Sequence, residues 1–151
     1  MPKRSEFPKF NFEGIRCEAK CVEVYDGDTF TLELPLGHIV AKYDPDVDKN
    51  QLPTSIYLRC RSMHYNSAEI RGKTQEERDK AIIDRDYLKS IILEKQLQVA
   101  FGENDMYGRP LTLVTLPDDV KRVGTEVMLH EHMLASGHGR PYEGKGEKNW
   151  H

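Results

Sequence analysis

Three short stretches of the sequence hold acidic and guanidinium side chains whose chemistry suits a phosphate-bearing ligand. Asp26-Gly27-Asp28-Thr29 offers two carboxylates in a tight turn, Glu69 follows Arg61 by eight positions, and Tyr107-Gly108-Arg109 carries a second arginine. Carboxylate oxygens can hold a hard cation, and a guanidinium makes forked hydrogen bonds to phosphate that lysine cannot reproduce. Each stretch has a plainer alternative, because Asp-Gly-Asp is common in hairpin turns and arginines on strands are usually solvated. Their order along the chain favours a shared site.

Taken together, the three stretches resemble the motif order of the thermonuclease (staphylococcal nuclease) family over residues 21–142. The resemblance implies an OB-fold domain acting as a calcium-dependent endonuclease that hydrolyses phosphodiester bonds of DNA, RNA or both. It also implies three calcium ligands: the side chains of Asp28 and Asn66 and the backbone carbonyl of Ser67. Asn66 stands where the family has Asp, so the site loses one formal charge. Because calcium affinity follows ligand charge, we expect weaker calcium binding.

The resemblance further implies substrate and catalytic roles. Arg61 and Arg109 correspond to the arginines that bind the scissile phosphate, and Glu69 to the general base. Tyr107 and Tyr142 correspond to aromatic residues that contact the nucleotide. Attack of water on a phosphodiester adds negative charge to the phosphoryl oxygens, which a cation and guanidiniums stabilise while a carboxylate accepts the water proton. One alternative stays open: a catalytically weakened nuclease fold that serves as a module binding nucleic acid or protein.

Local patterns predict the elements that carry these residues. β-Branched and aromatic residues flank the Asp-Gly-Asp turn, which indicates a hairpin over 21–34, and another strand follows at 56–63. Thr74 precedes acidic residues and begins a helix that we expect to continue to Lys95, with apolar residues at helical spacing along one face. The remaining expected elements are strands at 96–101 and 111–116 and a helix at 125–136 that stops at Gly137.

This order of elements predicts an α+β protein, a small five-stranded OB-fold β-barrel with two packed helices. Residues 36–54 are polar and contain several Asp and Pro, so we expect a loop there. The chain is divided into a flexible N-terminal arm (1–14), a nuclease-like OB-fold domain (15–142) and a mobile C-terminal tail (143–151). Because the sequence ends at His151, we expect the third helix of the best-known family members to be missing.

Composition limits the other functional classes. A net charge of −3 over 151 residues argues against generic nucleic-acid binding, so contacts to DNA or RNA must be local. No apolar stretch suits a signal peptide or a membrane span. The sequence has three cysteines, and no two of them form a C-x-x-C pair: Cys17, Cys21 and Cys60. We therefore expect an intracellular protein with free thiols, no membrane contact and no obligate protein partner. A zinc site at Cys17 and Cys21 would need two further ligands at sensible spacing.

Overall fold

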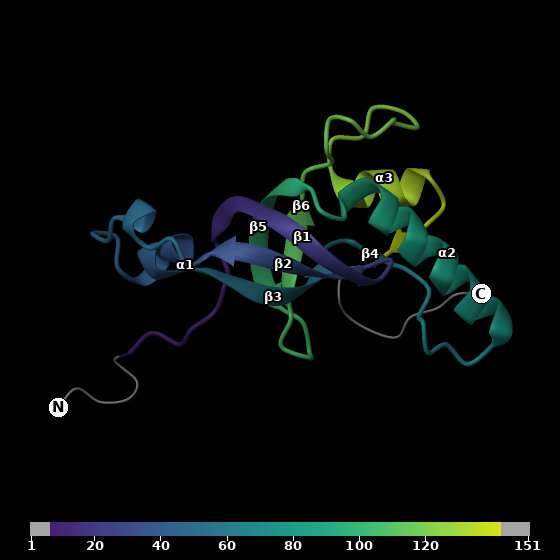
Figure 1. The fold of residues 1–151 in the computed structure, drawn as a ribbon. Helices are drawn as coiled ribbons and strands as arrows, with labels where there is room; N and C mark the ends of the chain where they lie inside the picture. The colour runs from purple at the N-terminus through teal and green to yellow at the C-terminus, as the bar shows by residue number, and fades with distance from the viewer. Residues whose placement is uncertain (1–6, 143–151) are drawn as a thin grey trace.

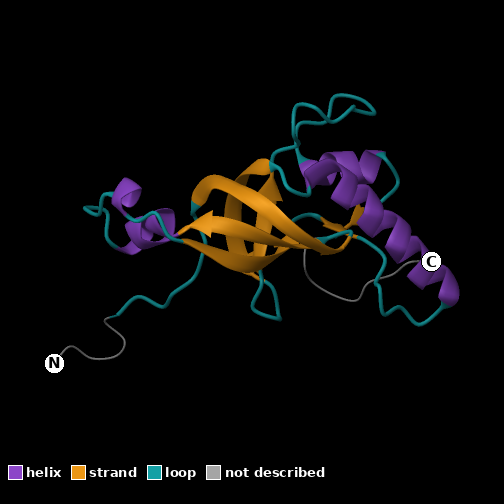
Figure 2. Ribbon diagram, in the orientation of Figure 1, coloured by secondary structure: helices purple, strands orange, loops and turns teal. Residues whose placement is uncertain are grey.

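Five strands close into a barrel, in the order β1-β2-β3-β6-β5 (Figures 1 and 2). The structure is a computed structural model that describes residues 7–142; the predicted tail at 143–151 and the first six residues of the predicted arm lie outside the described residues. The strands are β1 (Arg16–Asp26), β2 (Thr29–Pro35), β3 (Ser55–Ser62), β5 (Gln96–Asn104) and β6 (Pro110–Val114). The predicted α+β class and five-stranded OB-like barrel are confirmed.

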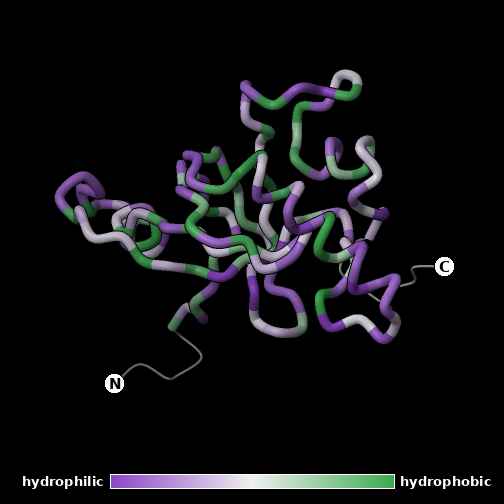
Figure 3. The backbone as a smooth tube through the Cα atoms, turned by 45° about the vertical axis from the view of Figure 1, so that its right-hand side comes forward, coloured by the Kyte–Doolittle hydropathy of each residue, from purple (hydrophilic) through white to green (hydrophobic). Residues whose placement is uncertain are grey.

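Alternation of side chains explains why these strands enclose a core. In β1 the buried residues Cys17, Ala19 and Cys21 alternate with more exposed ones, because successive side chains of a strand point to opposite faces. Phe30, Leu32 and Leu34 fill the barrel from β2 in the same way. Neighbouring strands pair antiparallel except β3 and β6, which are parallel. Figure 3 shows hydrophobic and hydrophilic segments alternating along the barrel.

The first hairpin is confirmed at the Asp-Gly-Asp turn. Asp26 pairs with Thr29 across the turn, and the Asp28 backbone N–H donates to the Asp26 side chain at 3.0 Å. Gly27 is required because a Cβ there would lie 2.6 Å from the Cβ of Ser67. The turn therefore packs directly on the loop that follows β3, and this contact joins two of the three predicted motifs.

The long helix is α2 (Gln75–Ile92), and it begins where the sequence predicts. The Thr74 hydroxyl caps it by accepting a hydrogen bond from the Glu77 N–H at 3.1 Å. Its apolar face packs against β1. The helix ends before the predicted Lys95, because Glu94 adopts a left-handed backbone with φ of 65°.

The last helix, α3 (Leu129–Ala135), is shorter than the predicted 125–136. Residues before it pair with the end of the barrel instead, since the Leu116 N–H donates to the Val127 carbonyl at 2.9 Å. The Glu126 carboxylate also accepts the N–H groups of Val123 and Gly124, which stabilises a loop. Gly137, with φ of 80°, ends the helix as expected.

A third helix, α1 (Leu36–Tyr43), forms where the sequence predicts only a loop. Ile39 is buried in the core, and Gly37 packs so closely on a short 3₁₀ turn, η2 (Lys49–Gln51), that a Cβ would clash with the Lys49 backbone. Tertiary packing therefore stabilises a helix with few local signals. Figure 1 places α1 at one end of the barrel and α2 with α3 at the other.

Two very short strands complete the end that carries α2. β4 (Tyr65–Asn66) pairs antiparallel with β7 (Arg140–Pro141), so the segment after α3 returns beside the loop that follows β3. Among the described residues, no helix is both long and apolar enough to cross a membrane.

Candidate functional site

The Asp28 carboxylate lies at the centre of the site and is almost fully buried. One oxygen accepts a hydrogen bond from the Thr29 hydroxyl at 3.1 Å, and the other accepts from the Ser67 backbone N–H at 2.9 Å. Nη2 of Arg61 lies 3.6 Å from the second oxygen. Burial of a charge is tolerated only when the charge is paired and hydrogen-bonded, and both conditions hold here.

Tyr65 supports the turn from beneath. Its hydroxyl donates to the Gly27 carbonyl at 2.7 Å, and its side chain is fully buried. Burial raises the pKa of Tyr65 well above its ordinary value, and the nearby charges of Asp28 and Asp26 raise it further. The hydroxyl therefore keeps its proton at neutral pH and remains a donor to the turn.

Arg61 links the turn to the loop that follows β3. It is 6% exposed, pairs with Asp28, and donates a hydrogen bond to the Asn66 side-chain oxygen. Its guanidinium also lies over the Tyr142 ring, 5.1 Å from the ring centre. The structure thus brings Asp28, Asn66 and Arg61 together, with the amide oxygen of Asn66 engaged by the arginine.

Arg109 is held by a carboxylate that the sequence reasoning did not identify. Nε and Nη2 of Arg109 both lie 2.8 Å from Oδ2 of Asp105, and Nη1 donates to the Thr29 hydroxyl at 3.2 Å. Asp105 also accepts the backbone N–H of Tyr107 at 2.9 Å, which shapes the loop. Through Thr29, Arg109 is joined to the same turn that carries Asp28. The sequence signal was an acidic residue four positions before the arginine.

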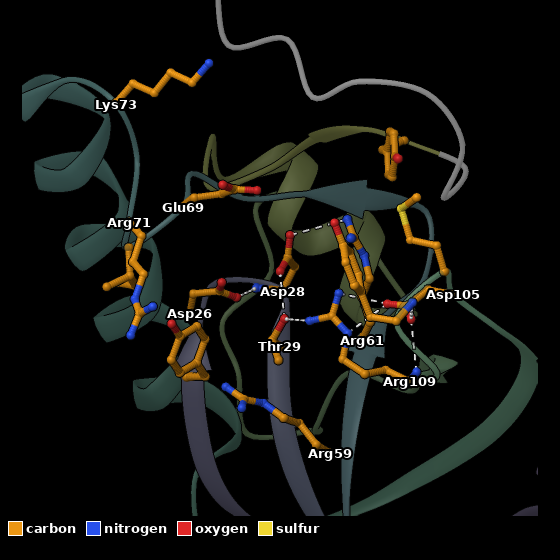
Figure 4. A pocket seen from close by; sticks show the side chains of 15 residues that line it. Asp26, Asp28, Thr29, Arg59, Arg61, Glu69, Arg71, Lys73, Asp105 and Arg109 are labelled. Atoms are coloured by element: carbon orange, nitrogen blue, oxygen red, sulfur yellow. Dashed lines mark hydrogen bonds and ion pairs between the residues drawn. The ribbon is translucent and has the colours of Figure 1, made fainter.

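These groups face a pocket of about 870 Å³ (Figure 4). Six of the predicted residues line it: Asp28, Arg61, Glu69, Tyr107, Arg109 and Tyr142. Asn66 and Ser67 lie beneath, at 4% and 0% exposure. For Ser67 the described contact is its N–H to Asp28, whereas the prediction concerned its carbonyl.

Further lining residues were missed. They are Tyr25, Asp26, Thr29, Arg59, Ile70, Arg71, Lys73, Asp105 and Met106. Five of the lining side chains are basic and four are acidic, so the pocket carries a slight positive excess although the whole chain is at −3. Local positive charge of this kind is what a phosphate ligand needs from an otherwise acidic protein.

Asp84 of α2 is a buried carboxylate behind the site. It is 0% exposed, lies 2.9 Å from Nδ1 of His138, and accepts a long hydrogen bond from the Ala68 N–H at 3.4 Å. Lys80 pairs with it at 3.2 Å. It therefore connects the loop that carries Glu69 to α2 and to the segment after α3. The available signal was a charged residue on the same helical stripe as Ala81 and Leu88.

The predicted donor set suits calcium by its chemistry. A carboxylate, an amide oxygen and a backbone carbonyl are all hard oxygen donors, and Asp26 and Glu69 bring further carboxylates to the same pocket. Within residues 7–142, no three His, Cys, Asp or Glu side chains cluster as metal ligands. Zinc at Cys17 and Cys21 does not fit, because burial raises the pKa of these thiols to about 11 and about 12.

Comparisons with known proteins assign no family to this chain. No protein-family model matches it, and no curated protein matches it. A barrel of this type carries many unrelated functions. Its chemistry must therefore be inferred from the residues of the pocket.

Proposed function

We propose that this protein is a calcium-dependent endonuclease of the thermonuclease type that hydrolyses phosphodiester bonds of DNA, RNA or both. One observation supports the proposal. Arg61 forms an ion pair with Asp28, Arg109 donates a hydrogen bond to Thr29, and Thr29 is itself hydrogen-bonded to Asp28. Both arginines line the same pocket as Glu69. Two fixed guanidiniums and a carboxylate in one pocket are groups that can catalyse phosphodiester hydrolysis, because they stabilise charge on the phosphate and accept a proton from water.

The guanidiniums act on the phosphate itself. Arg61 and Arg109 donate hydrogen bonds to its non-bridging oxygens, where negative charge grows as the bond to water forms. Their carboxylate partners, Asp28 and Asp105, hold them in place before substrate arrives, so little reorganisation is needed. Tyr107 and Tyr142, which lie beside these arginines, contact the nucleotide on the same side.

Glu69 accepts the proton of the attacking water, a contribution on the order of 10²–10⁴-fold in rate. Asp28, Asn66 and the Ser67 carbonyl would hold the calcium ion. When bound, calcium neutralises charge on the phosphate and orients it. Asn66 must then exchange its hydrogen bond with Arg61 for the cation, which is a further reason to expect weak calcium binding.

A reducing, intracellular location accompanies this proposal. All three cysteines, Cys17, Cys21 and Cys60, are free and buried. Free thiols persist in compartments where glutathione and thioredoxin keep them reduced.

Digestion of plasmid DNA and of RNA across a calcium titration, with EDTA as the zero point, tests the proposal. Cleavage should require added calcium and should produce internal cuts in at least one of the two polymers. Undiminished turnover in excess EDTA would show that the metal site is wrongly assigned, and a requirement for zinc would redirect attention to the cysteines and histidines.

The second candidate is a weakened nuclease fold that binds nucleic acid without cutting it. The observation that favours it is the hydrogen bond between Arg61 and Asn66, which occupies a predicted metal donor. Tight binding of oligonucleotides in calcium, with no cleavage at any calcium concentration, is the result that would support it.

A further inference from the structure

Arginine–tyrosine pairs recur around the pocket. The described residues contain four contacts of a cation over a tyrosine ring, and three of them line this pocket. Two are the pairs already given roles, Arg61 with Tyr142 and Arg109 with Tyr107, at 5.1 and 5.5 Å. The third, Arg59 with Tyr25 at 4.3 Å, has the shortest separation and no role so far.

Strand geometry places the third pair beside the first. Arg59 and Arg61 are two residues apart on β3 and pair with Thr31 and Thr29 of β2, so their side chains leave the same face of the sheet. Tyr25 immediately precedes Asp26 at the end of β1. In Figure 4, Arg59 extends toward the Asp26 side of the pocket, away from Asp105 and Arg109.

The third pair differs from the other two in its partners. Arg61 and Arg109 each have a carboxylate partner, Asp28 and Asp105. Within residues 7–142 the Arg59 side chain has only its contact with the Tyr25 ring, which is 38% exposed. An arginine without an anion and an exposed ring beside it leave one donor group and one stacking surface available to a ligand.

We propose that Tyr25 and Arg59 form a second nucleotide subsite, next to the scissile phosphate and opposite Tyr107. Tyr25 stacks with the base and Arg59 binds its phosphate, as aromatic and basic groups do together in single-strand binding. Cα atoms two residues apart on a strand are separated by about 6.6 Å, which allows Arg59 and Arg61 to contact neighbouring phosphates. The inference rests on the proposed function and narrows it, because a base can stack on Tyr25 only outside a duplex. The preferred substrate is therefore an unpaired strand of several nucleotides.

Fluorescence anisotropy of a labelled single-stranded DNA octanucleotide, in EDTA so that no cleavage occurs, measures the subsite directly. Tyr25→Ala should weaken binding about tenfold, and Tyr25→Phe should largely restore it because the ring is kept. Arg59→Ala should weaken binding and reduce the slope of log K against log salt by about 0.7, the value for one phosphate contact on a single strand.

Matched controls lie close by. Tyr57 is 71% exposed on the same strand, two residues before Arg59, yet it does not line the pocket, so Tyr57→Ala should bind like the wild type. Arg85 lies on α2 and is paired with Asp86, and Arg85→Ala controls for loss of one positive charge. A same-sequence duplex should bind more weakly than the single strand. Thermal unfolding of each variant checks that the fold is intact.

Cleavage kinetics separate this inference from the proposed function. In Tyr25→Ala, kcat/KM should fall more for the octanucleotide than for a p-nitrophenyl phosphodiester, and mainly through KM. Wild-type affinity in both Tyr25→Ala and Arg59→Ala would overturn the subsite even if the protein is a nuclease. Weakened binding in these variants, with no cleavage by the wild type, would keep the subsite and overturn the nuclease. Tighter binding of the duplex would overturn the single-strand preference.

Discussion

On one side of the pocket each arginine has a carboxylate partner, and on the other side the basic side chains have none among residues 7–142. The paired side consists of Arg61 with Asp28, both buried, and Arg109 with Asp105, both partly buried. The open side consists of Arg59, Arg71 and Lys73, and none of the three is hydrogen-bonded or ion-paired through its side chain there. Figure 4 shows Arg71 and Lys73 across Asp28 from Arg61 and Arg109.

Under the proposed function, this difference predicts separate roles for the basic side chains on the two sides of the pocket. A guanidinium fixed by a carboxylate loses little freedom when a phosphate arrives, and it stabilises charge where charge develops in the reaction. A basic side chain without a carboxylate partner adds attraction over a longer range but is held less firmly for the reaction, so it contributes to affinity and to association rate. We therefore expect substitutions on the paired side to lower kcat and those on the open side to raise KM.

Asp28→Ala should have the largest effect, because it removes the proposed calcium ligand and the partner of Arg61 together. Catalytic metals contribute several kcal/mol of transition-state stabilisation, so the rate of plasmid cleavage should fall by at least about 10³-fold. Calcium binding by titration calorimetry should be lost in parallel. Asp46→Ala, in an exposed loop, serves as the control and should be unaffected. Retained calcium binding in Asp28→Ala would exclude Asp28 as a ligand.

Arg109→Lys should lower kcat about 10²-fold, nearly as much as Arg109→Ala. A lysine ammonium cannot contact Asp105 and Thr29 at once while presenting two parallel donors to phosphate. Arg59→Lys provides the matched substitution on the open side, where charge matters more than forked geometry, and kcat should change little. Equal kcat losses at the two positions would contradict the division between the sides.

Asn66→Asp should strengthen calcium binding on the paired side of the pocket. A second carboxylate a few ångströms from a divalent ion should tighten calcium binding by about 1 kcal/mol or more, which lowers the calcium midpoint of cleavage up to about tenfold. Calcium titrations of cleavage rate on both proteins provide the measurement. Identical midpoints would mean that Asn66 is not a ligand, and absence of cleavage in both would favour the binding module.

Lys73→Ala should have the smallest effect, a rise in KM of about threefold on single-stranded substrate with kcat retained. The effect should disappear above about 0.5 M salt, because screening removes long-range attraction between exposed charges. Steady-state kinetics at two salt concentrations measure it. A fall in kcat that persists at high salt would place Lys73 on the paired side.

Strong local signals account for the parts of the fold that the sequence predicted. The Asp-Gly-Asp turn and the Thr74 cap each act within a few residues, so their structures follow from neighbours in the chain. α1 was missed because Ile39 and Gly37 are held by tertiary contacts with the core and with Lys49. The start of α3 was misplaced for a similar reason, because Val127 and Met128 pair with residues at the end of the barrel.

For the candidate site as well, the sequence indicated some residues and not others. Residues inside recognisable motifs, such as Asp28 and Arg109, do line one pocket. The partner Asp105 lies only four positions before Arg109, and this local signal was overlooked. The contact between Arg109 and Thr29 was not predicted because hydrogen bonds between distant segments leave no periodic pattern in a sequence. The Tyr25–Arg59 contact shows this most clearly, since it depends on the register of three strands.

Chemical labelling of the buried cysteines of the barrel can report local and global unfolding of the protein. Cys17, at 8% exposure, lies near the start of β1, whereas Cys60, at 0%, lies on β3, paired with Phe30 of β2 in the hydrophobic core. Alkylating reagents need an accessible thiolate, so each cysteine is modified only when its strand separates from the core. Cys17 should be labelled during fraying of β1 and Cys60 only during global unfolding. Mass spectrometry of the labelled protein would therefore distinguish local from complete opening without any introduced probe.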